Sequence, residues 1–255
     1  LSAGDALFQS MLAGETKAAL AIIEQTGRRD TQGVISDNGK LSGDALFVLD
    51  VEDADALIIA DQNGAFFSVP MRQTGVTVSP LSTIDRTRDV SKVELKAVQA
   101  EQLTEPGNVC GSVMIRTGRI LLAADTLGAA QTMLDRAVEY AKERQQFGRT
   151  IGSFQAVKHM CAEMAAKLEP ARALVWHAAH MVDVGDEEAD VAVCLAKAHL
   201  SEVGTFIART STEVHGGMGF TDLLGLHYWF KRIGMNRQVL GGPAMVREEA
   251  ARLQG

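Results

Sequence analysis

The spacing of apolar residues along the chain changes from the period of a β-strand to that of a helix. Up to residue 101, short apolar runs are separated by turn-forming residues such as Asp37–Gly39 and Gln62–Gly64. This pattern predicts short strands joined by tight turns, and their spacing favours a compact antiparallel barrel or sandwich. A short helix is expected before them, at residues 5–14. The expected strands lie at residues 18–23, 45–49, 56–60, 65–69 and 76–78.

From Arg119 onward, apolar residues recur every three to four positions, which is the period of a helix. Ser153 is a candidate N-cap for the second helical stripe, and Pro170 inside that stripe is expected to kink it. Long helices rich in Ala and Met usually pack into a bundle, often with one face against another subunit. The expected helices cover residues 120–141, 153–175, 186–212, 223–234 and 243–253.

The two periods together predict an α+β protein with two domains. Residues 1–110 are expected to form a β-domain, an antiparallel barrel or sandwich with a short preceding helix. Residues 111–255 are expected to form an all-α helical bundle. A chain of 255 residues is long enough to give each domain a hydrophobic core of its own.

Composition narrows the possible partners. The formal net charge of −7 argues against a nucleic-acid binder, which would be basic. No uninterrupted apolar run is long enough to span a bilayer, and the first residues lack the basic and apolar blocks of a signal peptide. The three cysteines, Cys110, Cys161 and Cys194, are isolated and lack the spacing of metal ligands. We therefore expect reduced thiols in a cytoplasmic protein with no membrane, metal or nucleic-acid partner.

Two separate segments carry residue types that suit a phosphate-bearing cofactor. The first, Arg144–Gly148, places an arginine and an aromatic residue beside a glycine at the end of a long helix. The second, Glu213–Phe220, contains the pair Gly216 and Gly217. Arginine offers a planar, permanently charged fork for a diphosphate. Glycines let backbone N–H groups approach phosphate oxygens. Either segment alone has a plainer explanation, since an arginine in a last turn usually binds helix carbonyls and a glycine pair usually ends a helix.

Taken together, these segments make the chain resemble the C-terminal half of an acyl-CoA dehydrogenase. The resemblance extends over residues 12–253 and is strongest over residues 137–171, AVEYAKERQQFGRTIGSFQAVKHMCAEMAAKLEPA. It implies an enzyme that uses FAD to convert an acyl-CoA thioester to its 2,3-enoyl-CoA and passes electrons to an electron-transfer flavoprotein. The family normally begins with a helical domain before its β-domain. That domain has no counterpart here, so we expect either a piece of a longer product or a short subunit.

In this family each FAD lies across a dimer interface, with its diphosphate and adenine end on helices of the neighbouring subunit. The resemblance implies that this chain keeps the neighbour's half of the site. Glu213 is a departure, because the family usually has Gln there and a carboxylate beside phosphate is repelled unless it points away or pairs. The implied cofactor-binding residues are Arg144, Gln146, Phe147, Ile151, Phe154, Gln155, Glu213, Val214, Gly216 and Gly217.

The half of the site that contacts the flavin ring departs from the family more strongly. A family loop, Thr-Glu-Pro followed by Gly-Ser-Asp, corresponds here to residues 23–30, so that Ile23 and Arg29 stand at hydroxyl-bearing positions. The next flavin segment, Trp-Ile-Thr, corresponds to Phe47–Leu49, and Leu49 again replaces a hydroxyl. Apolar or bulky groups thus stand where the family hydrogen-bonds its flavin.

The carboxylate base that removes the α-proton of the thioester is also missing. Its two family positions correspond to Gly241 and Gly118 in this chain. Asp125 lies one or two helical turns beyond Gly118, and we interpret it as a polar contact rather than a relocated base. Glu248 and Glu249, in the last helix, are expected to be solvated.

We therefore hypothesise that the chain is the subunit of a heteromeric acyl-CoA dehydrogenase that lacks the base and lends FAD contacts to a catalytic partner subunit. Its segment Leu240–Ala244 is similar to that of subunits of the α2β2 enzymes of actinobacteria, which act on steroid side-chain CoA esters. Three alternatives stay open: a homomeric dehydrogenase with Asp125 as base, a scaffold subunit that binds no FAD, and a different flavin reaction on the same fold.

Overall fold

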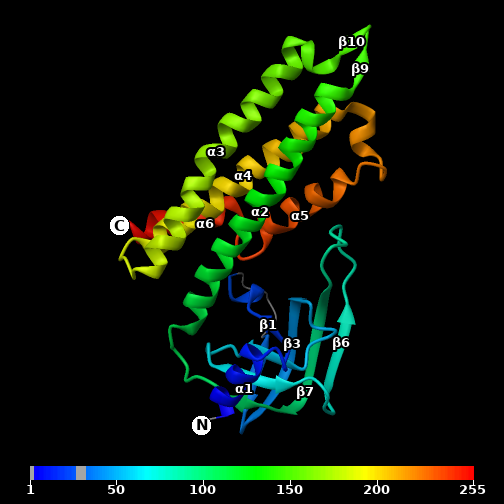
Figure 1. Ribbon diagram of the computed structural model, residues 1–255. Helices are drawn as coiled ribbons and strands as arrows, with labels where there is room; N and C mark the ends of the chain where they lie inside the picture. The colour runs from blue at the N-terminus through cyan, green and yellow to red at the C-terminus, as the bar shows by residue number, and fades with distance from the viewer. Residues whose placement is uncertain (1–2, 27–32) are drawn as a thin grey trace. The chain divides into compact units, whose positions relative to one another are not determined.

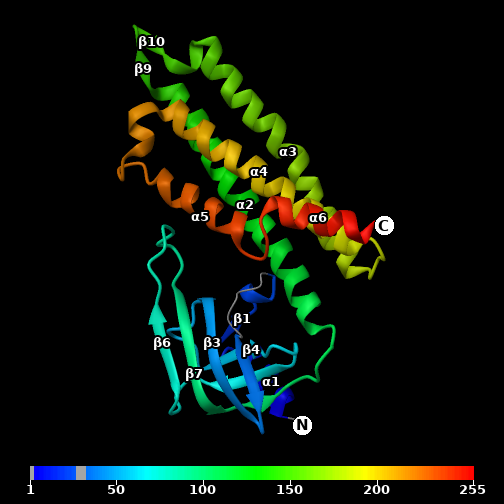
Figure 2. The same ribbon diagram turned by 180° about the vertical axis from the view of Figure 1, so that it is seen from behind.

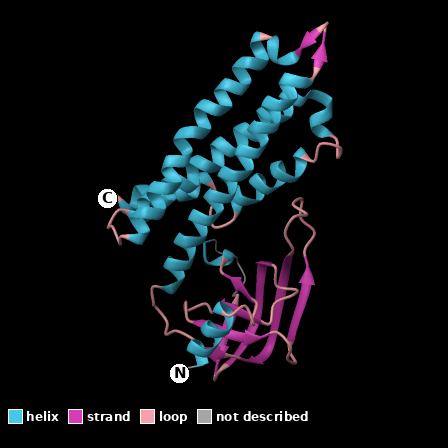
Figure 3. Ribbon diagram, in the orientation of Figure 1, coloured by secondary structure: helices cyan, strands magenta, loops and turns pink. Residues whose placement is uncertain are grey.

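The computed structural model describes residues 3–26 and 33–255. A region of β-sheets precedes a region of long helices (Figure 1, Figure 3), which confirms the α+β fold class. The chain divides into two compact units between residues 115 and 116, inside the long helix α2 (Cys110–Glu143). The predicted domain boundary between residues 110 and 111 stays a prediction.

The first unit contains two open four-stranded sheets, with strand orders β1-β4-β5-β8 and β2-β3-β7-β6. One strand pair differs from the predicted antiparallel arrangement, because β1 runs parallel to β4, with Ala18 beside Ala56. Strands β2 and β3 of the other sheet lie between them in the chain, and such a long crossover permits parallel pairing. The elements of this unit are α1 (Ala3–Leu12), β1 (Ala18–Ala21), η1 (Ile23–Thr26), β2 (Val34–Asp37), β3 (Lys40–Leu49), β4 (Ala56–Ala60), β5 (Phe66–Pro70), β6 (Val76–Pro80), β7 (Val90–Gln99) and β8 (Glu101–Gln102).

The two sheets enclose one hydrophobic core, so the unit is a sandwich rather than a closed barrel. Leu57 and Val69 from the first sheet and Leu41, Val48 and Val93 from the second all belong to that core. Apolar side chains on alternate positions of each strand reach this shared interior. The burial of the sandwich core is therefore what the apolar runs in the sequence predict.

Strand β3 contains a bulge between Ala45 and Val48. Phe47 has a φ of +58° at this bulge, and 48% of its surface is exposed, while Val48 is fully buried. The backbone N–H of Leu46 donates a hydrogen bond to Oε2 of Glu24 in η1, at 2.7 Å. The bulge thus turns Phe47 out of the sandwich and ties η1 to strand β3.

The second unit is a helical bundle with a small hairpin between its first two helices. All of the predicted helices are present, and the ends of all but α6 differ from the prediction. Ser153 is not the N-cap of α3: Phe154 holds that position, and Ser153 Oγ donates to the carbonyl of Thr150 at 2.7 Å. Helix α3 continues through Pro170. The elements after α2 are β9 (Gln145–Gln146), β10 (Arg149–Thr150), η2 (Ile151–Ser153), α3 (Gln155–Asp183), α4 (Ala189–His215), η3 (Gly216–Phe220), α5 (Leu226–Gln238) and α6 (Pro243–Leu253).

Helix α4 is the central helix of the bundle and packs against α3, α5 and α6 (Figure 2). Leu200 and Ile207 on this helix are fully buried. The segment from Ala189 to Phe220 is long enough, and with a mean hydropathy of 1.4 apolar enough, to cross a membrane, which qualifies the expectation drawn from apolar runs. In this fold 61% of the 18-residue window that has this mean hydropathy is buried inside the protein, as is usual for a core helix.

Candidate functional site

The hairpin β9–β10 lies between the C-terminal end of α2 and the N-terminal end of α3. Gln145 pairs with Thr150, and Gln146 pairs with Arg149, so only Phe147 and Gly148 form the turn. Both turn residues have positive φ, +55° and +75°, as the two central residues of a type I′ turn do. An aromatic residue rarely adopts this conformation. The sequence predicted a glycine break here, and the structure resolves it into a tight hairpin.

The hairpin displays aromatic and cationic side chains at the surface. Phe147 is 90% exposed and meets Phe154 edge to face, with 6.1 Å between ring centroids. The Arg149 guanidinium lies over the ring of Phe154, 4.0 Å from its centroid. Arg144 is exposed, and among the described residues its guanidinium has no hydrogen-bond or ion-pair partner. The hairpin therefore offers one stacked arginine and one arginine that is available to an anion.

The remaining residues of the first predicted set differ in accessibility. Gln146 is exposed in β9. Ile151 is half-buried and packs against the core of the bundle. Gln155 is exposed and shares a hydrogen bond with the ring of His159, with 3.0 Å between Nε2 atoms. Gln146 and Gln155 are thus open to a ligand, whereas Ile151 mainly supports the hairpin from below.

The second predicted segment forms the end of α4 and the turn η3. Gly216 ends the helix with φ +59° and ψ −139°. A Cβ built on Gly216 or Gly217 would meet no atom within 4 Å, so a ligand has room to approach this turn, although the backbone N–H of Gly216 already donates to the carbonyl of Glu213. Glu213 is exposed, while Val214 is buried in the bundle core. An anion could approach the glycine turn, whereas the buried side chain of Val214 is not accessible to a ligand.

The fold brings these two segments, far apart in the sequence, to the same end of the bundle (Figure 1, Figure 2). Helices α2 and α4 run side by side there, because Ser211 Oγ donates to the carbonyl of Met133 at 2.8 Å. One turn further on, the rings of Tyr140 and His215 stack with 4.5 Å between centroids. We call the hairpin β9–β10 and the turn η3 together the bundle tip.

A second region of the bundle contains the two positions that the resemblance assigns to the base. A Cβ on Gly118 would collide with Leu240 Cδ1. A Cβ on Gly241 would lie 2.5 Å from Met245 Cε and 2.9 Å from Val246 Cγ1, and Gly241 has a φ of +108°. Neither position has room for a larger side chain without movement of its neighbours. We call the surroundings of Gly118 and Gly241 the closed region.

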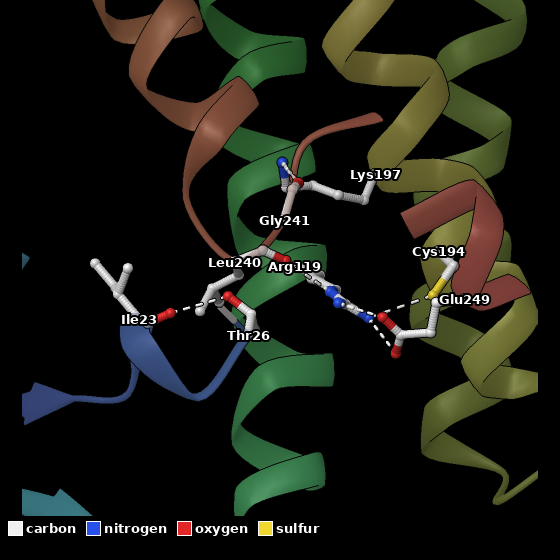
Figure 4. A network of polar contacts seen from close by, with 8 residues as sticks. All are labelled: Ile23, Thr26, Arg119, Cys194, Lys197, Leu240, Gly241 and Glu249. Carbon is white, nitrogen blue, oxygen red and sulfur yellow. Dashed lines mark hydrogen bonds and ion pairs between the residues drawn. The ribbon is translucent and has the colours of Figure 1, made fainter. Parts of the chain in front are cut away.

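Arg119 is the centre of the closed region (Figure 4), and only 4% of its surface is exposed. Its guanidinium donates to both carboxylate oxygens of Glu249, at 2.8 and 2.7 Å, and to the carbonyl of Leu240 at 2.9 Å. The hydrogen bonds from Arg119 hold the pKa of Glu249 below its usual value. Glu249 is thus paired with Arg119 while 41% of its side chain stays exposed, whereas Glu248 forms a surface pair with Arg252.

Lys197 is a second buried cation in the closed region, and the sequence analysis missed it. Its ammonium donates to the carbonyls of Asn236 at 2.7 Å and Gly241 at 3.2 Å (Figure 4 draws the second bond). Burial, together with the positive charges of Arg119 and Arg237, lowers the pKa of Lys197 to about 8. A lysine in the middle of an Ala-rich, fully apolar helix stripe was the only sequence signal for it. The ammonium closes the end of α5 by binding its last carbonyls.

Asp125 is engaged by neighbouring side chains rather than aimed at open space. Its Oδ2 accepts a hydrogen bond from Asn236 Nδ2 at 2.6 Å and lies 3.8 Å from Arg232 Nη1. This arrangement agrees with a polar packing contact. Within the part of the chain that the structure describes, no group of three or more His, Cys, Asp or Glu side chains could hold a metal ion.

Comparison with known proteins supports the resemblance on independent grounds. Residues 112–253 match the family model "Acyl-CoA dehydrogenase, C-terminal domain", which is more than half of the chain. The chain belongs to the acyl-CoA dehydrogenase family. The family comprises oxidoreductases that act on acyl-CoA, and it and the structural neighbours of this chain are FAD-binding flavoproteins.

Several acyl-CoA dehydrogenases are similar to nearly the whole chain. The acyl-CoA dehydrogenase IpdE2 of Mycobacterium tuberculosis is 35% identical, over 98% of this chain and 74% of its own length. IpdE2 of Mycolicibacterium smegmatis is 32% identical, over 98% of this chain and 75% of its own. Among solved structures, a variant of the Tcur3481-Tcur3483 steroid ACAD is 25% identical, covers 100% of this chain and 71% of its own, and has a TM-score of 0.86. Butyryl-CoA dehydrogenase of Megasphaera elsdenii shares the fold, with a TM-score of 0.85 at 22% identity over 96% of this chain and 70% of its own.

The residues of the bundle tip fit the family's cofactor, FAD. Arg144 supplies a guanidinium without a partner among the described residues, Phe147 an exposed ring, and Gly216 and Gly217 a turn with room for a ligand. These are the groups that a diphosphate and an adenine require. On the flavin-ring side, Ile23 lies in η1, where its carbonyl accepts a hydrogen bond from Thr26 Oγ1 at 2.9 Å (Figure 4). Arg29 lies outside the described residues.

Proposed function

We propose that this chain is the subunit of a heteromeric acyl-CoA dehydrogenase that provides no base and lends its bundle tip to FAD held mainly by a catalytic partner subunit. When bound, FAD would accept the hydride as the acyl-CoA thioester becomes the 2,3-enoyl-CoA. In this proposal Arg144 binds the diphosphate, Phe147 and Phe154 contact the adenine end, and the Gly216–Gly217 turn lies against a phosphate oxygen. The removal of the α-proton falls to a carboxylate of the partner subunit.

The observation that carries the proposal is the closed region. A subunit that performs the proton abstraction needs a carboxylate with access to the substrate. At Gly118 and Gly241 the space is filled by Leu240, Met245 and Val246, and the charges there are paired within the chain. By contrast, the cationic and aromatic groups of the bundle tip are exposed. An exposed cationic and aromatic surface together with a filled base position is what a non-catalytic half of a shared site would require.

The substrate and the assembly belong to the same proposal. The similarity to IpdE2 and to a steroid ACAD whose name joins two designations, Tcur3481 and Tcur3483, supports a steroid-derived acyl-CoA and a partner subunit of different sequence. The subunit CarC of a caffeyl-CoA reductase-Etf complex of Acetobacterium woodii is 37% identical over 52% of this chain and 36% of its own length. It supports an electron-transfer flavoprotein as the electron acceptor. Three free cysteines are consistent with the cytoplasmic location that we propose.

The flavin content of the purified chain tests this proposal. The chain alone should be colourless or bind FAD far below one per subunit, and a co-expressed partner should restore stoichiometric FAD. In that complex, Arg144→Ala should weaken FAD binding by roughly 1.5–3 kcal/mol, because a charge-assisted hydrogen bond to phosphate is lost. Arg209→Ala, which removes an exposed arginine on α4, is the matched control. A yellow homomer with full FAD and turnover would overturn the heteromer proposal, and unchanged affinity in Arg144→Ala would overturn the contact.

The homomeric alternative with Asp125 as base has less support. Asp125 accepts a short hydrogen bond from Asn236 and faces Arg232, and neither contact aims it at a substrate. Turnover by the chain alone that disappears in Asp125→Asn would establish this alternative. A complex without flavin, unaffected by Arg144→Ala, would instead identify a scaffold subunit.

A further inference from the structure

His215 lies between the two halves of the bundle tip and belongs to neither predicted set of FAD contacts. It is the last residue of α4, and only 5% of its surface is exposed. Its Nδ1 lies 2.7 Å from the carbonyl oxygen of Ser211. A carbonyl oxygen only accepts, so Nδ1 carries the proton of the imidazole. The ring is thereby held in one orientation by its own helix.

The faces of the imidazole join α4 to α2. His215 stacks on Tyr140 with 4.5 Å between centroids and 30° between the rings. The carbonyl of Tyr140 accepts a hydrogen bond from the backbone N–H of Arg144 at 2.8 Å, and the carbonyl of Arg144 accepts one from Ile151 at 2.8 Å. The stack thus lies one helical turn below the hairpin, and a rigid hydrogen-bonded path connects the two.

The turn η3 folds back on the same histidine. A Cβ added to Gly219 would lie 2.7 Å from the carbonyl oxygen of Thr212 and 3.2 Å from Cβ of His215. Only a glycine permits this close approach of η3 to the last turn of α4. Gly216 and Gly217 lie between these two contact points in the chain. The position of Gly216 and Gly217 therefore depends on how η3 packs against the last turn of α4, which ends at His215.

We propose that His215 is a positioning residue that fixes the glycine turn at Gly216–Gly217 relative to the hairpin that carries Arg144, and so shapes one binding site for the diphosphate of FAD. This inference rests on the proposed function. The affinity for a rigid diphosphate depends on both groups being in place before binding, because ordering a loose segment reduces the affinity. The stack supplies that order without touching the cofactor.

The ionisation of His215 adds a pH dependence to this role. Burial is the largest influence and lowers the pKa of His215. The positive charge of Arg136 on α2 also lowers this pKa, while backbone hydrogen bonds with Ser211 and Arg136 act in the opposite direction without reversing the shift. From α2 the ring also faces Tyr140, η3 contains no ionisable side chain, and Glu213 lies on the same helix as His215. The imidazole is therefore neutral near pH 7. Protonation, which begins below the usual histidine pKa of 6.5, places a cation in a buried site and loosens the tip.

The test uses the assembly in which the wild-type chain binds FAD, with two readouts. His215→Ala should raise the Kd for FAD about tenfold, because the tip must then be ordered on binding. It should also speed hydrogen exchange in peptides that cover residues 216–220 in the absence of FAD. His215→Phe retains the stack, so its Kd should stay within about threefold of wild type, and the extra loss of affinity between pH 7.5 and 5.5 should disappear. Tyr140→Leu should reproduce His215→Ala from the other side of the contact.

Two controls separate the possible failures. Leu168→Ala, a buried change in α3, should lower the melting temperature without altering exchange at residues 216–220. If His215→Ala behaves like Leu168→Ala in both readouts, His215 is only a core residue and the inference is overturned. If exchange increases in His215→Ala but neither it nor Arg144→Ala changes the Kd, the positional link stands and the proposed FAD contact fails.

Discussion

The bundle tip and the closed region treat polar side chains in opposite ways. At the tip, Arg144 and Phe147 are exposed to solvent and the glycine turn has room for a ligand. In the closed region, Arg119 and Lys197 are buried and their donors are spent on Glu249 and on backbone carbonyls. Groups left free can bind a ligand, whereas groups paired internally stabilise the fold. The comparison teaches that only the bundle tip leaves cationic and aromatic groups accessible to a ligand, whereas the closed region uses its polar groups for packing.

The largest effect is expected from an attempt to restore the base. Gly241→Glu should lower the free energy of unfolding by about 4 kcal/mol, because it combines the strain of a positive φ with overpacking against Met245 and Val246. Gly217→Ala, whose Cβ would meet nothing within 4 Å, should change it by less than about 0.5 kcal/mol. Urea unfolding of both variants measures the contrast. Equal stability of the two would mean that the closed region is loosely packed.

The next effect contrasts two arginines. Arg119→Met should lower the free energy of unfolding by about 3 kcal/mol, since it leaves the Glu249 carboxylate and the Leu240 carbonyl without their donor. Arg144→Met should change it by less than about 0.5 kcal/mol, as expected for an exposed side chain without a partner among the described residues. Thermal and urea unfolding should therefore show the larger loss of stability for Arg119→Met. FAD titration should show the larger loss of affinity for Arg144→Met.

A smaller effect follows from the ionisation of Lys197. Its pKa is lowered from 10.5 to about 8, so between these values the unfolded chain binds more protons and stability rises with pH, by at most about 3 kcal/mol. Burial raises the pKa of the Cys194 thiol from 9.0 to about 11, which makes stability fall with pH above 9. In Cys194→Ala the rise should therefore continue past pH 9, while wild type levels off. A flat profile of Cys194→Ala between pH 8 and 10 would contradict the lowered pKa of Lys197.

The smallest effect concerns the turn of the hairpin. Phe147→Gly should stabilise the chain by up to about 1 kcal/mol, because glycine adopts a φ of +55° without strain. The same variant should bind FAD more weakly, since the exposed ring is lost. The melting temperature measures the gain in stability, and FAD titration measures the loss of affinity. A variant that is both less stable and unchanged in affinity would show that Phe147 supports the hairpin instead.

The sequence predicted the regular parts of the fold because apolar periodicity is a local property. Helix α6 was predicted to the residue, and β4 likewise. What was missed depends on contacts between distant residues. The parallel pairing of β1 with β4 requires knowledge of the crossover. The bond between Arg119 and Glu249 joins positions 130 residues apart, so composition made Glu249 look like an ordinary surface residue.

The candidate site was predictable only as far as motifs reach. Arg144, Phe147 and the Gly216–Gly217 pair are marked by unusual residue types at the ends of helices, and the structure places them at one end of the bundle. Val214 belongs to the same motif, yet its side chain lies in the core. A motif does not specify which face of a helix a residue occupies. Lys197 and His215 were missed since their roles arise from burial.

Helix α4 connects the two regions, with Lys197 of the closed region near its start and His215 beside the bundle tip at its last residue. Its 27 residues form a continuous rod of roughly 40 Å. Inserting or deleting one residue between these positions would rotate one end against the other by about 100°. A substitution along this helix therefore leaves the two regions in the same relative orientation, whereas a change in its length does not.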